Sequence, residues 1–216
     1  LWSSWEIYSY GDSTMSTISA DQIKGRSITG NKITVPTGQK IVGTDTGSIV
    51  APGHVLQVKQ AVISNTQSST TGNTWLALSG FNVSITPTSS SSKFLLQLHA
   101  VVGMAYWQLS FRFKRGSTAV GVGDVDSTRQ PSSVTYNSYD YGSSSPTGGG
   151  LQYGIRPMSM TYLDSPATTS AITYGIDWKG YSTSYTIYLN RSYNNSDSTS
   201  YDDRRISTFT VMEIAQ

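Results

Sequence analysis

The feature that most constrains this chain is a strict alternation of apolar and polar residues in the part that follows residue 53. The clearest run has apolar side chains at every second position, namely Trp107, Leu109, Phe111 and Phe113. The positions between them are polar, namely Gln108, Ser110, Arg112 and Lys114. A period of two sends successive side chains to opposite faces of a strand, so the run predicts a β-strand with one buried face.

Similar runs recur throughout residues 54–216, and Gly, Pro and Ser residues separate them. They amount to about nine short strands, without any helical pattern of ten residues, which is typical of a sandwich or a barrel. Only 13% of the chain is charged and 14 residues are Tyr, a composition that favours strands. We therefore predict an all-β protein in which residues 54–216 form one jelly-roll-like β-sandwich head.

Residues 18–53 follow a different rule, because an isoleucine recurs every five residues at first and more loosely later. The positions are Ile18, Ile23, Ile28, Ile33 and Ile41. A period of five fits neither a helix nor a strand, and so few apolar residues cannot build a core in one chain. Three chains wound about one axis could bury them together, which predicts an extended trimeric β stalk. The alternative is an extended linker.

Residues 1–17 are rich in aromatic side chains, including Trp2, Trp5 and Tyr8. Such a segment needs a neighbour to bury its rings, so we predict an anchor or docking segment. Its Gly11-Asp12-Ser13 sequence resembles the start of a hydrolase nucleophile motif, but the usual His and Asp partners cannot be recognised. The chain opens at Leu1 instead of Met, which is typical of a fragment or a processed product.

Composition excludes several kinds of chemistry. The chain has no Cys and only two His, so a disulfide framework, a thiolate site and a histidine-based metal site are not expected. The net charge is only +2, and the basic residues are scattered, so we expect no nucleic-acid partner. No apolar run approaches the roughly 18 residues of a membrane span. We predict no enzyme activity, no metal and no cofactor; the pair Asp124 and Asp126 indicates a turn rather than a glycosidase site.

Two long loops carry the residues that we expect to contact a receptor. They are Tyr136, Asn137, Tyr139, Asp140 and Tyr141 in the first loop, and Tyr193, Asn195 and Tyr201 in the second. Tyr supplies rigid contact area at low entropic cost, and Asn and Ser supply adaptable hydrogen bonds. The alternatives are packing of a loop against its own domain or a neighbouring protomer, or disorder. The second loop also has oxygen ligands for Ca²⁺, but it lacks the EF-hand spacing.

Several sequence segments of the chain resemble a family of phage virion proteins. This family is common in marine phages and cyanophages, and its members are usually described as tail fibre or structural proteins. The segments are NVSITPTSSSSKFLLQLHAVVG, KRGSTAVGVGD, MTYLDSPATTSAITYGI, IYLNRSYNNSD and STFTVMEIAQ, with ITVPTGQKIVGTDTGSIVAPG in the stalk. The resemblance covers roughly residues 28–216. It implies a location in the virion and a trimeric fibre, and it carries over no catalytic or binding residue.

We therefore expect a homotrimeric phage tail fibre, located on the virion, whose head contacts a host surface glycan or protein during adsorption. Three weak sites on one tip would gain avidity through multivalency. The low charge suits a neutral polar surface and predicts adhesion that depends little on salt. The alternative is an architectural role, as a head fibre, a capsid decoration protein or a tail adaptor without a receptor.

Overall fold

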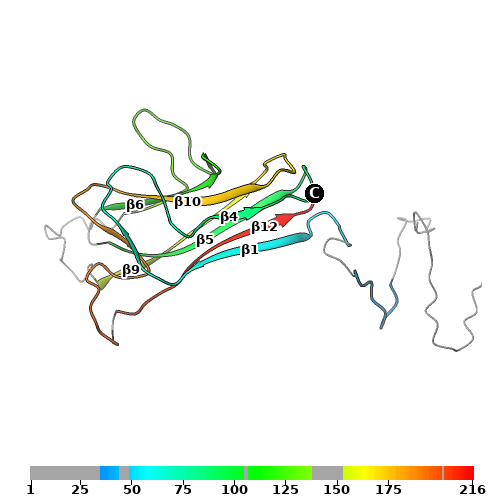
Figure 1. The fold of residues 1–216 in the computed structure, drawn as a ribbon, viewed down its shortest axis with the longest axis horizontal. Coiled ribbons are helices and arrows are strands. Elements are labelled where there is room, and N and C mark those ends of the chain that lie inside the picture. Colours follow the sequence, from blue (N-terminus) through cyan, green and yellow to red (C-terminus); the bar gives the residue numbers. More distant parts are fainter. Residues whose placement is uncertain (1–34, 44–48, 105–106, 138–152, 201) are drawn as a thin grey trace, which may run out of the picture. The chain divides into compact units, whose positions relative to one another are not determined.

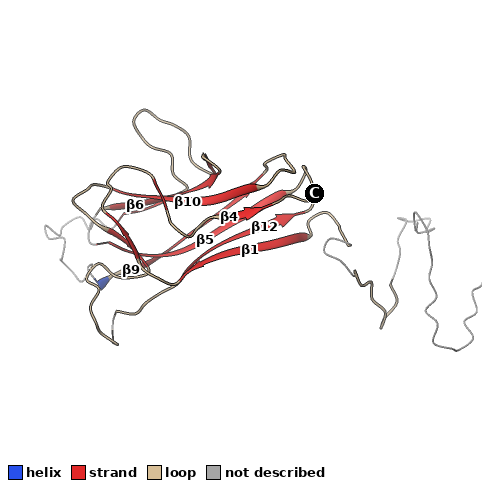
Figure 2. Ribbon diagram, viewed as in Figure 1, coloured by secondary structure: helices blue, strands red, loops and turns tan. Residues whose placement is uncertain are grey.

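A computed structural model of the chain describes residues 35–43, 49–104, 107–137, 153–200 and 202–216. The chain divides into two units, Leu1–Val42 and Gly43–Gln216. In the described part the regular structure is β, without any α-helix, and all of its strands belong to the second unit (Figure 2). The all-β prediction is therefore confirmed.

The first sheet is antiparallel and is built around the longest strand, β5 (Lys93–Met104). One edge of β5 pairs with β9 (Ile155–Asp164) along nearly its whole length. The other edge is shared by β12 (Ser207–Ile214), which pairs with Lys93–His99, and by the short β11 (Ile187–Leu189), which pairs with Val102–Met104. Two strands complete the sheet: β1 (Val55–Ile63) beside β12, and β2 (Gln67–Ser69) beside β11.

The second sheet is also antiparallel, and its central pair is β10 (Ile172–Gly180) with β6 (Gln108–Arg115). The outer edge of β10 pairs with two short strands, β3 (Leu76–Ala77) and β4 (Val83–Ile85). The outer edge of β6 likewise pairs with β7 (Thr118–Val120) and β8 (Val134–Asn137). Figure 1 shows β6 and β10 in one layer and β1, β5 and β12 in the other.

This strand order is that of a jelly roll. If the two short pairs β3/β4 and β7/β8 each count as one strand and the short β2 and β11 are set aside, the chain supplies eight strands, B to I. The first sheet then has the order B-I-D-G, formed by β1, β12, β5 and β9. The second has the order C-H-E-F, formed by β3/β4, β10, β6 and β7/β8. The jelly-roll prediction for the head is thus confirmed.

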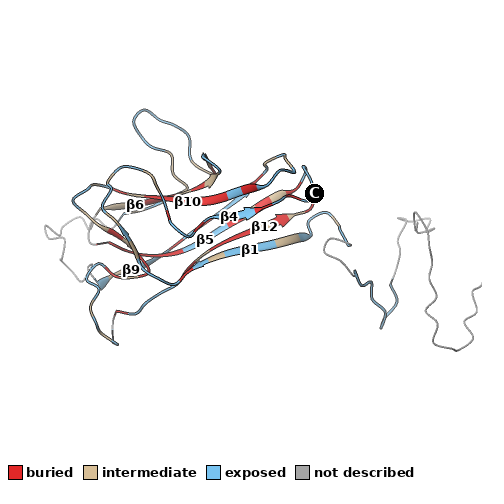
Figure 3. Ribbon diagram, viewed as in Figure 1, coloured by how far each residue is buried: buried red, intermediate tan, exposed pale blue. Residues whose placement is uncertain are grey.

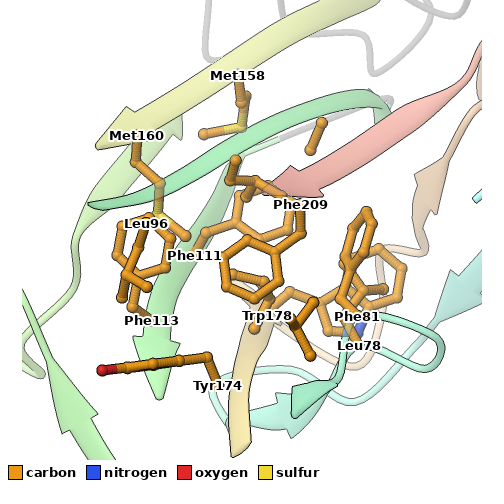
Figure 4. Close-up of a cluster of buried hydrophobic side chains, with 14 of the residues drawn as sticks. Leu78, Phe81, Leu96, Phe111, Phe113, Met158, Met160, Tyr174, Trp178 and Phe209 are labelled. Carbon is orange, nitrogen blue, oxygen red and sulfur yellow. The ribbon is translucent and has the colours of Figure 1, made fainter. Parts of the chain in front are cut away.

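The core fills the space between the two sheets, as expected from the alternation in sequence. Phe209 of β12 lies fully buried in it, with ring centroids 6.4 Å from Phe81 and 5.9 Å from Phe113. Figure 4 shows Met158 and Met160 covering this cluster from the side of β9, with Trp178 and Tyr174 opposite. The inward positions of β5, β6, β10 and β12 are buried, whereas β1 is largely exposed (Figure 3).

Two carboxylates inside the sandwich are tied to partners on other strands. Asp164 of β9 accepts hydrogen bonds from Arg115 Nη1 at 2.8 and 3.0 Å and from the Tyr174 hydroxyl at 2.7 Å, which joins the first sheet to the second. Burial and the Asp164 carboxylate raise the pKa of Tyr174 far above its ordinary value, so its proton stays on this bond. The second carboxylate, Glu213, is fully buried on β12.

Glu213 links β12 to Gln57 of β1 and to Thr88, which follows β4. It accepts hydrogen bonds from Gln57 Nε2 at 2.5 Å and from both the backbone N–H and the hydroxyl of Thr88 at 2.7 Å. Burial alone would raise the pKa of Glu213, but the donors from Gln57 and Thr88 outweigh it and lower the pKa below its ordinary value. The ionised carboxylate therefore stabilises the folded chain.

The predicted stalk and anchor fall mainly on residues that the structure does not describe. Residues 1–17 and the isoleucines Ile18, Ile23, Ile28 and Ile33 lie outside the described ranges. Ile41 is described, and 67% of its surface is exposed in the single chain. The trimeric stalk and the domain boundaries at residues 17 and 53 stay predictions.

Candidate functional site

The first predicted receptor loop is described only at its start. Tyr136 and Asn137 end strand β8, whereas Tyr139, Asp140 and Tyr141 lie outside the described residues. Tyr136 pairs with Leu109 and packs against the core, and its hydroxyl oxygen accepts a hydrogen bond from Arg156 Nε at 3.1 Å. Asn137 pairs with Gln108 and is exposed. Of these two, Asn137 offers the more accessible polar group.

The second predicted loop follows β11 and is held in shape by buried hydrogen bonds. Asp202 accepts from the Ser192 hydroxyl at 2.9 Å and from the Ser196 backbone N–H at 2.5 Å. Asn195 is exposed in this turn, and Tyr193 is 37% exposed with its ring edge-to-face against Tyr188.

The two loops leave from different sheets, because β8 belongs to the second sheet and β11 to the first. Tyr201 lies outside the described residues, so the structure places only Tyr193 and Asn195 of the second group.

A cluster of charged side chains lies on the outer face of the second sheet, around a buried acid. Asp177 of β10 is only 3% exposed. Arg112 Nε and Nη2 both donate to its Oδ2, at 3.0 and 2.8 Å, and Lys114 Nζ lies 3.0 Å from its Oδ1. The strand register explains the cluster, since Asp177 pairs directly with Arg112.

Trp75 lies beside this cluster, with two cations over its ring. The Arg112 guanidinium carbon is 4.4 Å and the Lys179 ammonium 5.1 Å from the ring centroid, both within the range of a cation–π contact. Lys179 Nζ also donates to Gln130 Oε1 at 3.1 Å and to Asn73 Oδ1 at 3.4 Å. Burial and the neighbouring Arg112 lower the pKa of Lys179. The Lys179 ammonium therefore donates to neutral acceptors, Asn73 and Gln130, and lies near the positive charge of Arg112.

Next to Lys179 the outer face of the second sheet is hollowed. The hollow has a volume of about 180 Å³ and is lined by Asn73, Gln108, Ser110, Lys179, Gly180 and Tyr181. Tyr181 is 49% exposed, and its ring stacks on Trp107 with centroids 4.7 Å apart and planes 17° from parallel. We call this the Lys179 hollow. It combines an aromatic surface, a cation and neutral hydrogen-bonding groups, which is the chemistry of a polar ligand site.

Sequence reasoning missed the Lys179 hollow because its residues are far apart in the chain. Asn73 precedes β3, Gln108 and Ser110 lie on β6, and Lys179 and Tyr181 lie at the end of β10. The alternation did predict that Gln108 and Ser110 face away from the core. Only the pairing of β6 with β10 brings them to Lys179.

In contrast to the charged outer face of the second sheet, the outer face of the first sheet carries rows of neutral side chains. The strand registers align three rows of side chains across β1, β12, β5 and β9. The rows are Val58, Met212, Leu95 and Leu163; Gln60, Thr210, Gln97 and Thr161; and Val62, Thr208, His99 and Ser159. Residues of the last two rows line a shallow neutral hollow around His99, which is exposed.

The predicted turn at Asp124 and Asp126 is an exposed loop in the structure. Asp126 pairs with Arg129 three residues later, and the Arg129 N–H donates to the Asp126 carbonyl at 3.0 Å. The described residues contain no group of three or more His, Asp or Glu side chains that could hold a metal ion. They also contain no helix that is long and apolar enough to span a membrane.

Comparisons with known proteins find only distant structural similarity. No protein-family model matches the chain, and no curated protein matches its sequence. Two solved structures of infectious bursal disease virus are similar to it: the Gx strain, at 13% identity and a TM-score of 0.31, and a VP2 subviral particle, at 10% identity and a TM-score of 0.32. Each match covers 82% of this chain but only 38% and 43% of the viral chains.

Proposed function

We propose that this chain is a virion structural protein, and more specifically a homotrimeric phage tail fibre whose head, residues 54–216, contacts the host surface. The observation that carries the proposal is the jelly-roll order of the two sheets, a fold used by viral capsid proteins and by lectins. The resemblance of residues 28–216 to phage fibre proteins supports the same role. A fold alone does not imply a function, so the proposal depends also on the surface of the head.

In this proposal each part of the chain has a separate task. Residues 1–17 attach to other virion proteins, residues 18–53 form the trimeric stalk, and the head presents its receptor-contacting loops. Tyr193 and Asn195 support contact with a receptor because both are exposed on a turn that Asp202 holds in shape. A preformed loop binds with less loss of entropy than a flexible one.

The proposal is tested by locating the head on the virion and by blocking it. Antibody fragments raised against residues 54–216 should label the tail tip in electron micrographs and should prevent adsorption of the phage to its host. Labelling of the capsid, with normal adsorption, would show the architectural role instead. Fragments against residues 1–17 serve as the control, since an anchor buried in the virion should not be labelled.

The trimer is tested by placing charge on the predicted stalk axis. The double substitution Ile28→Asp and Ile33→Asp should reduce the trimer to monomers, because three buried carboxylates at each level cannot be solvated. The mass in solution, measured by light scattering, gives the result. The matched control Lys24→Asp and Lys32→Asp changes charge at positions between the isoleucines and should leave a trimer. A trimer with the Ile substitutions would contradict the stalk.

A further inference from the structure

We infer that the Lys179 hollow binds an acidic saccharide, with a sugar ring against Tyr181 and its carboxylate or sulfate group at Lys179. The inference deepens the proposed function and rests on it for its biological setting, since a surface polysaccharide is then what the head recognises. Three independent properties of the hollow lead to it: an aromatic platform, an excess of positive charge, and a set of neutral polar groups at its floor.

The aromatic platform is the ring of Tyr181. It is 49% exposed although it lines the hollow, and Trp107 supports it by stacking at 4.7 Å. Trp107 has a φ of +69°, a conformation that a bulky side chain rarely adopts. Such strain persists only where the surroundings enforce it, and it concentrates at binding sites. The C–H face of a pyranose packs well on a supported ring of this kind.

The positive charge comes from three cations on a face that holds a single carboxylate near them, Asp177. Arg112, Lys114 and Lys179 all project from the outer face of β6 and β10, and Asp177 forms ion pairs with the first two. Among the described residues no carboxylate lies within 4.0 Å of Lys179 Nζ, whose acceptors are the amide oxygens of Asn73 and Gln130. Three positive charges and one negative charge leave a local excess of two, which an anionic ligand would balance.

The neutral groups suit the hydroxyls of a sugar. Gln108, Ser110 and Asn73 line the hollow, and amide and hydroxyl groups can both donate and accept hydrogen bonds. The Ser110 hydroxyl is buried and bonded to Thr135 at 2.9 Å, and Asn73 Oδ1 accepts from Lys179, so a ligand would use the remaining donors and acceptors of this lining. The size of the hollow sets the number of rings that it can hold. At about 180 Å³ it is smaller than the roughly 300 Å³ at which drug-sized pockets begin, so it fits one sugar residue of a chain that continues into solvent.

The test is a titration of the full chain with defined oligosaccharides, followed by tryptophan fluorescence and calorimetry. Trigalacturonate supplies carboxylates, a κ-carrageenan oligosaccharide supplies sulfates, and maltotriose is the neutral reference. We expect at least one acidic oligosaccharide to bind saturably and at least tenfold more tightly than maltotriose. The acidic ligand that binds identifies the anionic group. Failure of both acidic ligands to bind would overturn the inference.

Two variants remove the two halves of the site. Lys179→Gln removes the charge and Tyr181→Ala removes the platform, and each should weaken binding of the acidic ligand at least tenfold. Tyr181→Phe keeps the ring and should bind within threefold of the parent, which guards against loss through misfolding. Lys93→Gln on the first sheet is the matched control and should bind within twofold of the parent.

Further outcomes distinguish a saccharide site from general charge attraction and from a nucleic-acid site. An equal loss with Lys93→Gln would show only general attraction to a basic protein and would overturn the inference. A twelve-residue oligothymidylate that binds as tightly, with the same loss in Lys179→Gln, would replace the saccharide by a nucleic acid.

If the acidic ligand binds but antibodies against the head do not block adsorption, the site stands and the fibre proposal fails. If adsorption is blocked but neither acidic ligand binds, the fibre proposal stands and the saccharide site is wrong.

Discussion

The two outer faces of the sandwich have the same backbone geometry but opposite surface chemistry. On the first sheet the central rows are neutral, made of Val, Thr, Gln and His side chains, and its carboxylates Asp164 and Glu213 are buried. On the second sheet the outward positions hold Arg112, Lys114 and Asp177, with Trp75 beside them. Only 13% of the residues are charged, yet several of them lie together on the outer face of the second sheet.

This contrast shows how an average composition can hide a local site. Few charges overall predict weak electrostatics, and the side chains in the central rows of the first sheet are neutral. On the second sheet the same small number of charges is concentrated by the register of β6 with β10. Recognition on this face should accordingly depend on salt, since the field of three cations is screened over about 8 Å at physiological ionic strength.

The largest effect on stability is expected from Asp177→Asn, which removes the acid of the second face. The change leaves Arg112 and Lys114 without their counter-charge while they remain about one fifth exposed. Breaking a fully buried pair costs about 3–5 kcal/mol, and partial solvation of the cations reduces this to about 2–3 kcal/mol. Urea unfolding followed by tryptophan fluorescence measures the loss.

The matched control for Asp177→Asn is Asp203→Asn. Asp203 pairs with Arg205, but both side chains are well exposed, at 60% and 42%. An exposed pair contributes about 0–1 kcal/mol, so this variant should unfold close to the parent midpoint. Equal losses in the two variants would show that the cluster on the second face is no more than an ordinary surface ion pair.

An intermediate effect is expected from Glu213→Gln, which neutralises a carboxylate inside the first sheet. An amide presents an N–H group where the carboxylate accepted from Gln57 or Thr88, and mismatched buried hydrogen bonds cost about 1–3 kcal/mol. The folded state lowers the pKa of Glu213, so its stabilising effect is complete above the ordinary carboxyl pKa and is lost as the pH falls through the lower, folded value.

The unfolding free energy of the parent and of Glu213→Gln, measured from pH 7 down to pH 3, checks the sign of this effect. The difference between the two proteins should be largest near neutral pH and should shrink as the pH falls. A difference that grows toward acid pH would contradict the ionised state of Glu213 in the fold. Asp203→Asn again serves as the control for a carboxylate at the surface.

The sequence predicted the fold well because the signal for it is local. Alternation identifies inward side chains such as Phe111 and Phe113 without knowledge of their partners, and both are buried. It also identifies Arg112 and Lys114 as outward, but the partner that holds them, Asp177, is 65 residues from Arg112 in the chain. Pairing between distant strands depends on the whole tertiary structure. The Lys179 hollow could not be predicted for the same reason, since three separate segments supply its lining.

The smallest effect is expected from Gln97→Ala on the neutral face. Gln97 lies in the middle row of the first sheet, between Thr210 and Thr161, and its side chain is exposed. Substitutions at such positions usually change stability by no more than about 0.5 kcal/mol. Its affinity for the acidic oligosaccharide should equal that of the parent, because the opposite sheet carries the proposed site. A tenfold loss of affinity in Gln97→Ala would mean that the neutral face takes part in recognition. The proposal that only the outer face of the second sheet binds the ligand would then be wrong.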